Sequence, residues 1–326
     1  MEQCQRFRLP SPASGCALMQ DEEHHDVVVL GGGPAGVSCA LECFDIQLDT
    51  VLLETHRILG GQLVEIQHRV RNIAAGEFEN GRALQQALER SAAILADRVR
   101  LEQRVARADL GDPSVEVDGR RITAKAMLIA TGSASQRLPA APDGAFGGDV
   151  TYEIESGMDR FLGRDVVIIG GGDSATLDAL ALAREGSSVM LVHRSDRLTA
   201  RHDIVEDVRR ESRITDLPGW ELDAVQGTDR LEEIVLVRPV TGERRTVTAG
   251  GLIIKISRLP NTSAFRGQLE LDRHGAVVVD DELRTSRPGV FAAGDVVAGA
   301  YWRVATALGQ GCLAARSILR YVEERP

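Results

Sequence analysis

Two glycine-rich turns constrain what this chain can fold into. The first, residues 31–36 (Gly-Gly-Gly-Pro-Ala-Gly), follows the strand-like run 26–30 and precedes a stretch of helical periodicity. The second, residues 170–175 (Gly-Gly-Gly-Asp-Ser-Ala), occupies the same place after the run 165–169. Short apolar runs that end in glycine are typical of buried parallel strands. The repeated pattern predicts an α/β fold with two Rossmann-like dinucleotide-binding units.

Length, charge and cysteine content exclude several classes of protein. A chain of 326 residues with 43% apolar and 26% charged residues is ordinary for a globular protein of about two domains. The net charge of −10 disfavours a nucleic-acid partner. No apolar run approaches the ~20 residues of a membrane span, and the N-terminus lacks a secretory signal. Five scattered cysteines without a Cys-x-x-Cys favour the reducing cytoplasm.

Apolar periodicity predicts alternating strands and helices after a flexible N-terminal extension at residues 1–24. The expected strands are 26–30, 50–54, 101–106, 114–117, 126–130, 165–169, 188–192, 252–256, 275–279 and 289–293. The expected helices are 34–46, 81–96, one that ends at Ala183, one within 201–213, and 306–323.

The first turn has the features of a dinucleotide site. Gly31 permits the tight turn, Gly33 lets the backbone approach a pyrophosphate, and Gly36 lets the helix pack on the strand. The pyrophosphate would bind at the helix N-terminus, where free N–H groups and the helix dipole favour an anion. Glu54, at the end of the next strand, would accept a hydrogen bond from a ribose hydroxyl. The alternative is an ordinary turn followed by a solvated glutamate.

The second turn differs at the end of its second strand. There the chain reads His193-Arg194, with Arg197 three residues later, where an NAD site has a carboxylate. Arginines can bind a 2′-phosphate, so this turn predicts NADP(H) as the ligand. The alternative is a basic, solvated loop.

Further motifs connect the two units. Residues 130–132 (Ala-Thr-Gly) lie between them, and residues 289–295 (Gly-Val-Phe-Ala-Ala-Gly-Asp) lie near the end. With these, the chain resembles the low-molecular-weight thioredoxin reductases, which are related to ferredoxin–NADP and flavodoxin–NADP reductases of the same fold. The resemblance covers residues 27–321. It implies FAD and NADPH as cofactors, a homodimer, and an NAD(P)H-binding domain (135–262) inserted in a discontinuous FAD-binding domain (25–134 and 263–326).

The resemblance also implies which residues contact each cofactor. Those for FAD are Gly31, Gly33, Pro34, Ala35, Gly36, Glu54, Gly61, Gln62, Asn72, Val105, Thr131, Gly132, Gly294, Asp295, Arg303, Val304 and Ala305. Those for NADPH are Gly170, Gly172, Asp173, Ser174, Ala175, His193, Arg194 and Arg197. The match at Asn72 departs from the family pattern, because the Pro-Gly that follows it in the family is replaced by residues 73–76 (Ile-Ala-Ala-Gly). No metal site is implied.

One departure from the family decides the expected function. Thioredoxin reductases carry Cys-x-x-Cys-Asp-Gly shortly before the second turn, whereas this chain has Tyr-Glu-Ile-Glu-Ser-Gly at 152–157. Tyr152 and Glu155 thus replace the two cysteines, and neither can form a disulfide. We interpret Cys39, Cys43 and Cys312 as packing residues, while Cys4 and Cys16 lie in the extension. Ordinary thioredoxin reductase activity is therefore not expected.

A second departure is Trp302-Arg303, where the family commonly has Arg-Gln. A cation at position 303 would stabilise the anionic reduced flavin, and Trp302 would lie near the flavin ring or the incoming acceptor. The alternative is that Trp302 packs at the rim and Arg303 forms a salt bridge.

These features predict a cytoplasmic FAD enzyme that takes hydride from NADPH and passes electrons directly from flavin to an external acceptor. The acceptor is a ferredoxin-like or flavodoxin-like carrier, a small disulfide or another small molecule. Glu155 is the expected proton donor where one is needed, and Tyr152 and Trp302 are further catalytic candidates. The alternatives are a flavin-dependent oxidase or dehydrogenase of a small metabolite with a vestigial NADPH domain, and a non-catalytic flavin redox sensor.

Overall fold

The computed structural model describes residues 22–74, 76–153 and 158–324. Expectations that concern residues 1–21 or Glu155 lie outside the described residues, whereas residues 22–24, expected to end the flexible extension, belong to a strand. Within the described ranges, no helix is both long and apolar enough to cross a membrane.

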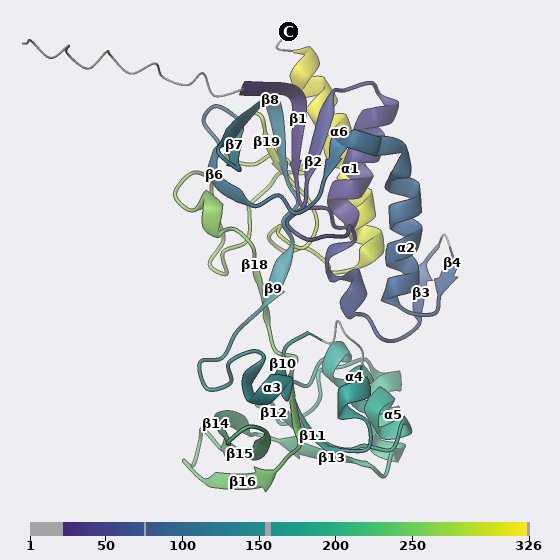
Figure 1. Ribbon diagram of the computed structural model, residues 1–326, viewed down its shortest axis with the longest axis vertical. Coiled ribbons are helices and arrows are strands. Elements are labelled where there is room, and N and C mark those ends of the chain that lie inside the picture. The colour runs from purple at the N-terminus through teal and green to yellow at the C-terminus, as the bar shows by residue number, and fades with distance from the viewer. Residues whose placement is uncertain (1–21, 75, 154–157, 325–326) are drawn as a thin grey trace, which may run out of the picture.

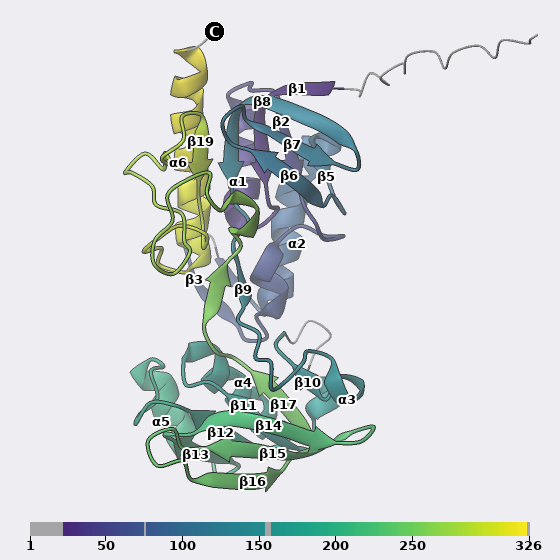
Figure 2. The ribbon, with the colours of Figure 1, turned by 90° about the vertical axis from the view of Figure 1, so that its left-hand side faces the viewer.

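Two lobes stack along the long axis of the molecule (Figure 1). We call the lobe built around β1 (Glu22–Leu30) the first lobe, and the lobe built around β11 (Asp165–Ile169) the second lobe. Figure 2 shows two extended segments, β9 (Ser133–Ser135) and β18 (Arg258–Pro260), running between the lobes. These two strands pair in antiparallel fashion. The chain therefore leaves the first lobe and returns to it along one short ribbon.

The first lobe has a seven-stranded sheet in the order β5-β2-β1-β8-β7-β6, with β19 paired to β8. Besides β1, its strands are β2 (Thr50–Leu53), β5 (Val99–Arg100), β6 (Val105–Asp109), β7 (Ser114–Val117), β8 (Arg120–Ile129) and β19 (Val290–Ala292). Its helices are α1 (Pro34–Asp45), α2 (Gly81–Ala92) and α6 (Val304–Glu323), and β3 (Val70–Ile73) forms a hairpin with β4 (Gly76–Phe78).

The centre of this sheet is buried on both faces. Successive residues of a strand point to opposite faces, so Val27 and Val29 of β1 pack into the cluster formed with α1 and α6. Val28 and Leu30 pack into a second cluster formed with β6, β7 and β19. Burial on both faces explains why β1 ends as an uninterrupted apolar run rather than an alternating one.

The second lobe has a five-stranded parallel sheet in the order β10-β17-β11-β12-β13. Its other strands are β10 (Val150–Thr151), β12 (Ser188–His193), β13 (Ile214–Pro218) and β17 (Gly251–Ile254), and its helices are α3 (Ala145–Gly148), α4 (Asp173–Arg184) and α5 (His202–Arg210). An antiparallel sheet of β14 (Glu221–Gly227), β15 (Leu231–Val237) and β16 (Arg244–Thr248) lies at the end of this lobe away from the first lobe (Figures 1 and 2).

The expected strands 114–117 and 165–169 are confirmed at both ends, as β7 and β11. Two other expected strands are wrong. The chain pairs at β5 and β6 but leaves 101–104 between them, so 101–106 is no continuous strand. Instead of the strand expected at 275–279, Val277 forms isolated bridges to Leu271 and Val297.

Several boundaries also differ from expectation; for example, β8 begins at Arg120 rather than at Ala126. β1 begins at Glu22 rather than Asp26, because residues 22–25 continue its parallel ladder with β8. The helix expected at 81–96 ends at Ala92 and continues as a 3₁₀ helix, Ala93–Arg98. Ala96 within it has a φ of +48°, which interrupts the helical backbone.

Candidate active site

Several of the residues predicted for the first lobe lie where three parallel strands end. β1 leads into Gly31, β8 leads into Thr131 and Gly132, and β19 leads into Gly294. Gly31 has a φ of +109°, and a Cβ there would overlap the carbonyl oxygen of Ala130. The carboxyl ends of parallel strands form the usual ligand-binding edge of such sheets. The structure thus brings together segments that are far apart in the sequence.

The glycines of the first turn fit a bound dinucleotide. A Cβ at Gly36 would overlap the carbonyl oxygen of Gly31, so helix α1 packs directly on the turn. A Cβ at Gly33 would meet no atom within 4 Å. Its φ of −72° is one that any residue adopts, so packing does not explain a glycine at this position. No side chain caps α1, and its free N–H groups leave room for a pyrophosphate there.

Glu54 lies beside this turn, as a ribose-binding acid would. Its carboxylate is buried, and Oε2 accepts a 2.6 Å hydrogen bond from the Gly32 N–H. Oε1 accepts from the backbone N–H of His56 at 2.8 Å. His56 Nδ1 also lies 2.8 Å from Oε1, so Oε2 is the oxygen that keeps a lone pair for a ribose hydroxyl. The backbone N–H of Gln103 donates to the carbonyl of Glu54, which places the segment before Val105 at the same edge.

Gln62 and Asp295 meet on the side of the site that faces the second lobe. The Gln62 side-chain amide donates to Ser133 Oγ at 3.1 Å and to Asp295 Oδ2 at 3.4 Å. Burial raises the pKa of Asp295. By contrast, the side chain of Asn72 is exposed on β3, and no contact in the described part of the chain ties it to this cluster.

The second turn repeats the geometry of the first. Gly170 has a φ of +145°, and a Cβ there would overlap the carbonyl oxygen of Lys255. At Gly172 the nearest atom to a Cβ would be Thr199 Oγ1 at 3.9 Å, so this position again borders open space. Helix α4 begins at Asp173 without a side-chain cap. This is a second place where a pyrophosphate fits.

The residues at the end of β12 divide into a buried and an exposed group. His193 is buried against Gly171, and its Nε2 lies 2.8 Å from Asp216 Oδ1. Arg194 and Arg197 are exposed. His193 therefore supports the turn from beneath, while the two arginines are open to a ligand.

The segment before α6 reaches across to the second turn. Arg303 stacks its guanidinium 4.7 Å from the centre of the Tyr301 ring, and Nη2 lies 3.7 Å from Asp173 Oδ2. The Trp302 side chain is 41% exposed. The salt bridge that was the alternative role for Arg303 is thus present, and its partner belongs to the other lobe.

Tyr152 has no access to solvent. Its exposure is 0%, and its hydroxyl donates to the carbonyl of Ala141 at 2.9 Å and accepts from the N–H of Leu138 at 2.7 Å. Burial raises the pKa of the phenol. A buried, hydrogen-bonded phenol has a packing role, and we do not retain Tyr152 as a catalytic candidate.

The described cysteines lie away from this segment. Cys39 and Cys43 are buried on α1 with their sulfur atoms 3.9 Å apart, nearly twice the length of a disulfide bond. Cys312 is exposed on α6, 3.6 Å from a carboxylate oxygen of Glu42. None of the three is paired.

Sequence reasoning missed the polar network at the junction of the lobes. Arg258 of β18 donates to Glu65 Oε2 at 2.9 Å and to Ser133 Oγ at 3.2 Å. Close by, Lys255 and Asp178 form a buried pair at 3.5 Å. Burial raises the pKa of Asp178 to about 6 despite this lysine. No local pattern signals these residues, because their partners lie in other segments.

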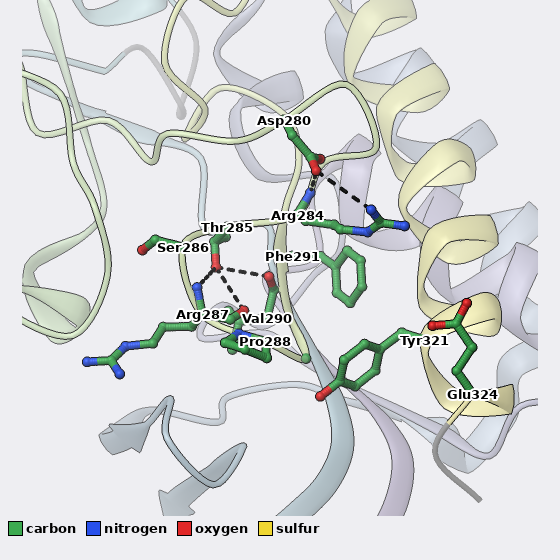
Figure 3. A pocket seen from close by; sticks show the side chains of 11 residues that line it. Asp280, Arg284, Thr285, Ser286, Arg287, Pro288, Val290, Phe291, Tyr321 and Glu324 are labelled. Atoms are coloured by element: carbon green, nitrogen blue, oxygen red, sulfur yellow. Dashed lines mark hydrogen bonds and ion pairs between the residues drawn. The ribbon is translucent and has the colours of Figure 1, made fainter.

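A pocket of about 550 Å³ lies elsewhere, between the 280–290 loop and the end of α6 (Figure 3). It borders Val290, the first residue of β19, whereas Asp295 follows the opposite end of that strand. Polar side chains at its wall bind their own loop: Thr285 Oγ1 donates to the carbonyl of Val290 at 2.9 Å. The pocket is therefore separate from the two glycine turns.

Comparisons with known proteins agree with this geometry. A family model described as pyridine nucleotide-disulphide oxidoreductase matches residues 25–311. A thioredoxin reductase of Mycolicibacterium smegmatis is 32% identical over 92% of this chain and 97% of its own length. A "34.2 kDa protein in rubredoxin operon" of Clostridium pasteurianum is 28% identical over 93% of this chain and 99% of its own length. The crystal structure of Lactococcus lactis thioredoxin reductase (FR conformation) is 28% identical, with a TM-score of 0.85 over 92% of this chain and 99% of that one.

Proposed function

The chain belongs to the pyridine nucleotide-disulphide oxidoreductase family, and on this premise we propose that it passes electrons from NADPH through FAD directly to an external acceptor. The thioredoxin reductase-like members use FAD and NADPH, which are therefore the cofactors of this protein.

The observation that carries the proposal is the chemistry of the segment before the second turn. The sequence contains no Cys-x-x-Cys, and position 152 is a buried tyrosine bonded to backbone groups. A disulfide relay needs a thiolate that can attack and an accessible sulfur to be attacked. The buried pair Cys39 and Cys43 offers neither access nor bonding distance. The acceptor would then have to meet the flavin itself.

We assign FAD to the first lobe. Its pyrophosphate would bind at Gly33 and the start of α1, its adenosine ribose at Glu54, and its ribityl chain at Asp295. The flavin would lie near Gln62, on the side of the lobe that faces the second lobe. When bound, FAD accepts two electrons as hydride and can release them singly or in pairs. The FAD-binding domain would then comprise residues 25–134 and 263–326.

We assign NADPH to the second lobe, residues 135–262. Its pyrophosphate would bind at Gly172 and the start of α4. Arg194 and Arg197 would bind the 2′-phosphate, because both are exposed at the end of β12, where a carboxylate would repel it.

We infer that the acceptor is a small redox carrier of the ferredoxin or flavodoxin type, or a small oxidant. The relative from a rubredoxin operon supports a carrier other than thioredoxin. Trp302, 41% exposed before α6, is the candidate contact for this acceptor. Glu155 is the candidate proton donor where the acceptor takes up a proton.

The experiment that tests the proposal is anaerobic titration of the FAD-loaded protein with NADPH. The proposal predicts that the visible flavin absorption is lost rapidly, and that rubredoxin or ferricyanide, added next, restores it. Loss of the absorption with a small metabolite but not with NADPH would instead favour a metabolite dehydrogenase. A flavin that no donor reduces would favour a redox sensor.

A further inference from the structure

The first lobe places a positive side chain at the second glycine turn. Arg303 Nη2 lies 3.7 Å from Oδ2 of Asp173, the first residue of α4. Both side chains remain about one-third exposed, so a ligand can reach them. Burial and the positive charge of Arg201 hold the pKa of the imidazole of His68, also of the first lobe, below its usual value. The first lobe therefore contacts this turn through the segment before α6.

Asp173 opposes the anion site in which it stands. The free N–H groups and the positive dipole end of α4 attract a pyrophosphate, but the negative charge of Asp173, the first helical residue, repels it. Within the second lobe, Arg201 partly neutralises the negative charge of Asp173. Its backbone N–H donates to Asp173 Oδ1 at 2.9 Å, and its Nε lies 3.4 Å from Oδ2.

The charge balance of the turn depends on the first lobe. Arg201 Nε lies 3.4 Å from Asp173 and 3.9 Å from Asp203, so these three second-lobe side chains together carry a net charge of −1. Arg303 adds one positive charge, and it does so only where the lobes meet as they do here. A pyrophosphate at α4 is therefore attracted more strongly in this arrangement than by the second lobe alone.

We propose that Arg303 is an NADPH-binding residue supplied from across the lobe junction, so that NADPH and the joined arrangement of the lobes stabilise each other. The inference rests on the proposed function, because it takes NADPH as the ligand of the second turn. A ligand that binds one arrangement more tightly shifts the equilibrium toward it by the same free energy. Arg303 then acts on the dinucleotide rather than on the flavin.

The test is equilibrium binding of NADP⁺ to the oxidised, FAD-loaded protein at low and high salt. We expect Arg303→Gln to raise the Kd by about fivefold at low salt, with a smaller effect at high salt. Arg303→Lys, which keeps the charge, should restore most of the affinity. Arg316→Gln, which removes an exposed arginine from the same helix, is the matched control and should leave the Kd unchanged.

Two further measurements separate the inference from its alternatives. Small-angle X-ray scattering should show NADP⁺ shifting the wild type, but not Arg303→Gln, toward the joined arrangement. The flavin midpoint potential should be equal in both proteins. An unchanged Kd for NADP⁺ in Arg303→Gln overturns the inference, whether or not the flavin midpoint potential changes. If NADPH fails to reduce the wild-type flavin, the proposed function itself is wrong, which is a separate result.

Discussion

The phenol of Tyr152 donates a 2.9 Å hydrogen bond to the carbonyl oxygen of Ala141. The same hydroxyl accepts from the N–H of Leu138 at 2.7 Å, so one side chain holds the 138–141 segment against the end of β10. The guanidinium of Arg137 covers the ring at 4.5 Å from its centre. Position 152 therefore stabilises the second lobe, and its hydroxyl is committed to the backbone.

Tyr152→Phe tests this assignment. Removing the hydroxyl leaves two backbone groups without their partner, and we expect the free energy of unfolding to fall by about 1–2 kcal/mol. The rate of electron transfer from NADPH to ferricyanide should not change. Urea unfolding and steady-state kinetics measure the two effects. Tyr301→Phe, at an exposed position, is the control. A slower reaction with unchanged stability would return Tyr152 to the catalytic candidates.

The first turn allows a substitution that affects the cofactor alone. Gly33→Ala adds a methyl group where no protein atom lies within 4 Å, so the protein should fold. We expect FAD to be lost during purification, because the methyl group occupies the space assigned to the pyrophosphate. Flavin content per protein and the circular dichroism spectrum measure this. Gly309→Ala adds a methyl group to open space on α6 and should retain FAD. Full flavin content in Gly33→Ala would refute the assignment.

Gly172→Ala is the corresponding change at the second turn. The nearest atom to the new methyl group would be Thr199 Oγ1 at 3.9 Å, so folding and FAD content should be normal. We expect the KM for NADPH to rise at least tenfold, because the methyl group would meet the pyrophosphate. Reduction of the flavin by dithionite should be unaffected. A normal KM would place NADPH elsewhere.

The glycine turns show what could be predicted from the sequence. Each needs a short strand, a positive φ at its first glycine and a helix that starts within a few residues, and all three requirements are local. The structure accordingly has positive φ values of +109° at Gly31 and +145° at Gly170. The buried strands that lead into these turns are equally predictable, since both faces of each are apolar.

The contacts between the lobes could not be predicted from the sequence, because they join residues that are distant along the chain. The approach of Arg303 to Asp173 joins residues 130 positions apart and requires the arrangement of the two lobes. The contact of Arg258 with Glu65 likewise spans 193 positions. The error at 275–279 has the same origin: its apolar pattern reflects burial around Val277, but no neighbouring strand continues the pairing there.

The buried pair of Asp178 and Lys255 predicts a specific pH dependence of stability. The folded-state pKa of Asp178 is about 6, above its usual value. Between pH 4 and 6 the folded protein thus keeps a proton that the unfolded chain has lost, and stability through this group falls as pH rises. Asp178→Asn should lack this loss. The free energy of unfolding of the variant minus that of the wild type should therefore be larger at pH 7 than at pH 4.5.

Urea unfolding at the two pH values measures this difference. Asp165→Asn, an exposed position on β11, should show no such change with pH and serves as the control. If the stability difference between Asp178→Asn and wild type is the same at pH 4.5 and pH 7, the carboxyl group is not held protonated by burial.

A variant in which all five cysteines are replaced by alanine or serine tests whether electrons leave the flavin without a cysteine relay. The measurement is the rate at which ferricyanide or rubredoxin reoxidises the NADPH-reduced flavin. We predict the same rate as in the wild type, and no NADPH-dependent reduction of thioredoxin by either protein. A large loss of rate in the cysteine-free variant, or reduction of thioredoxin by the wild type, would show that cysteine thiols do carry the electrons.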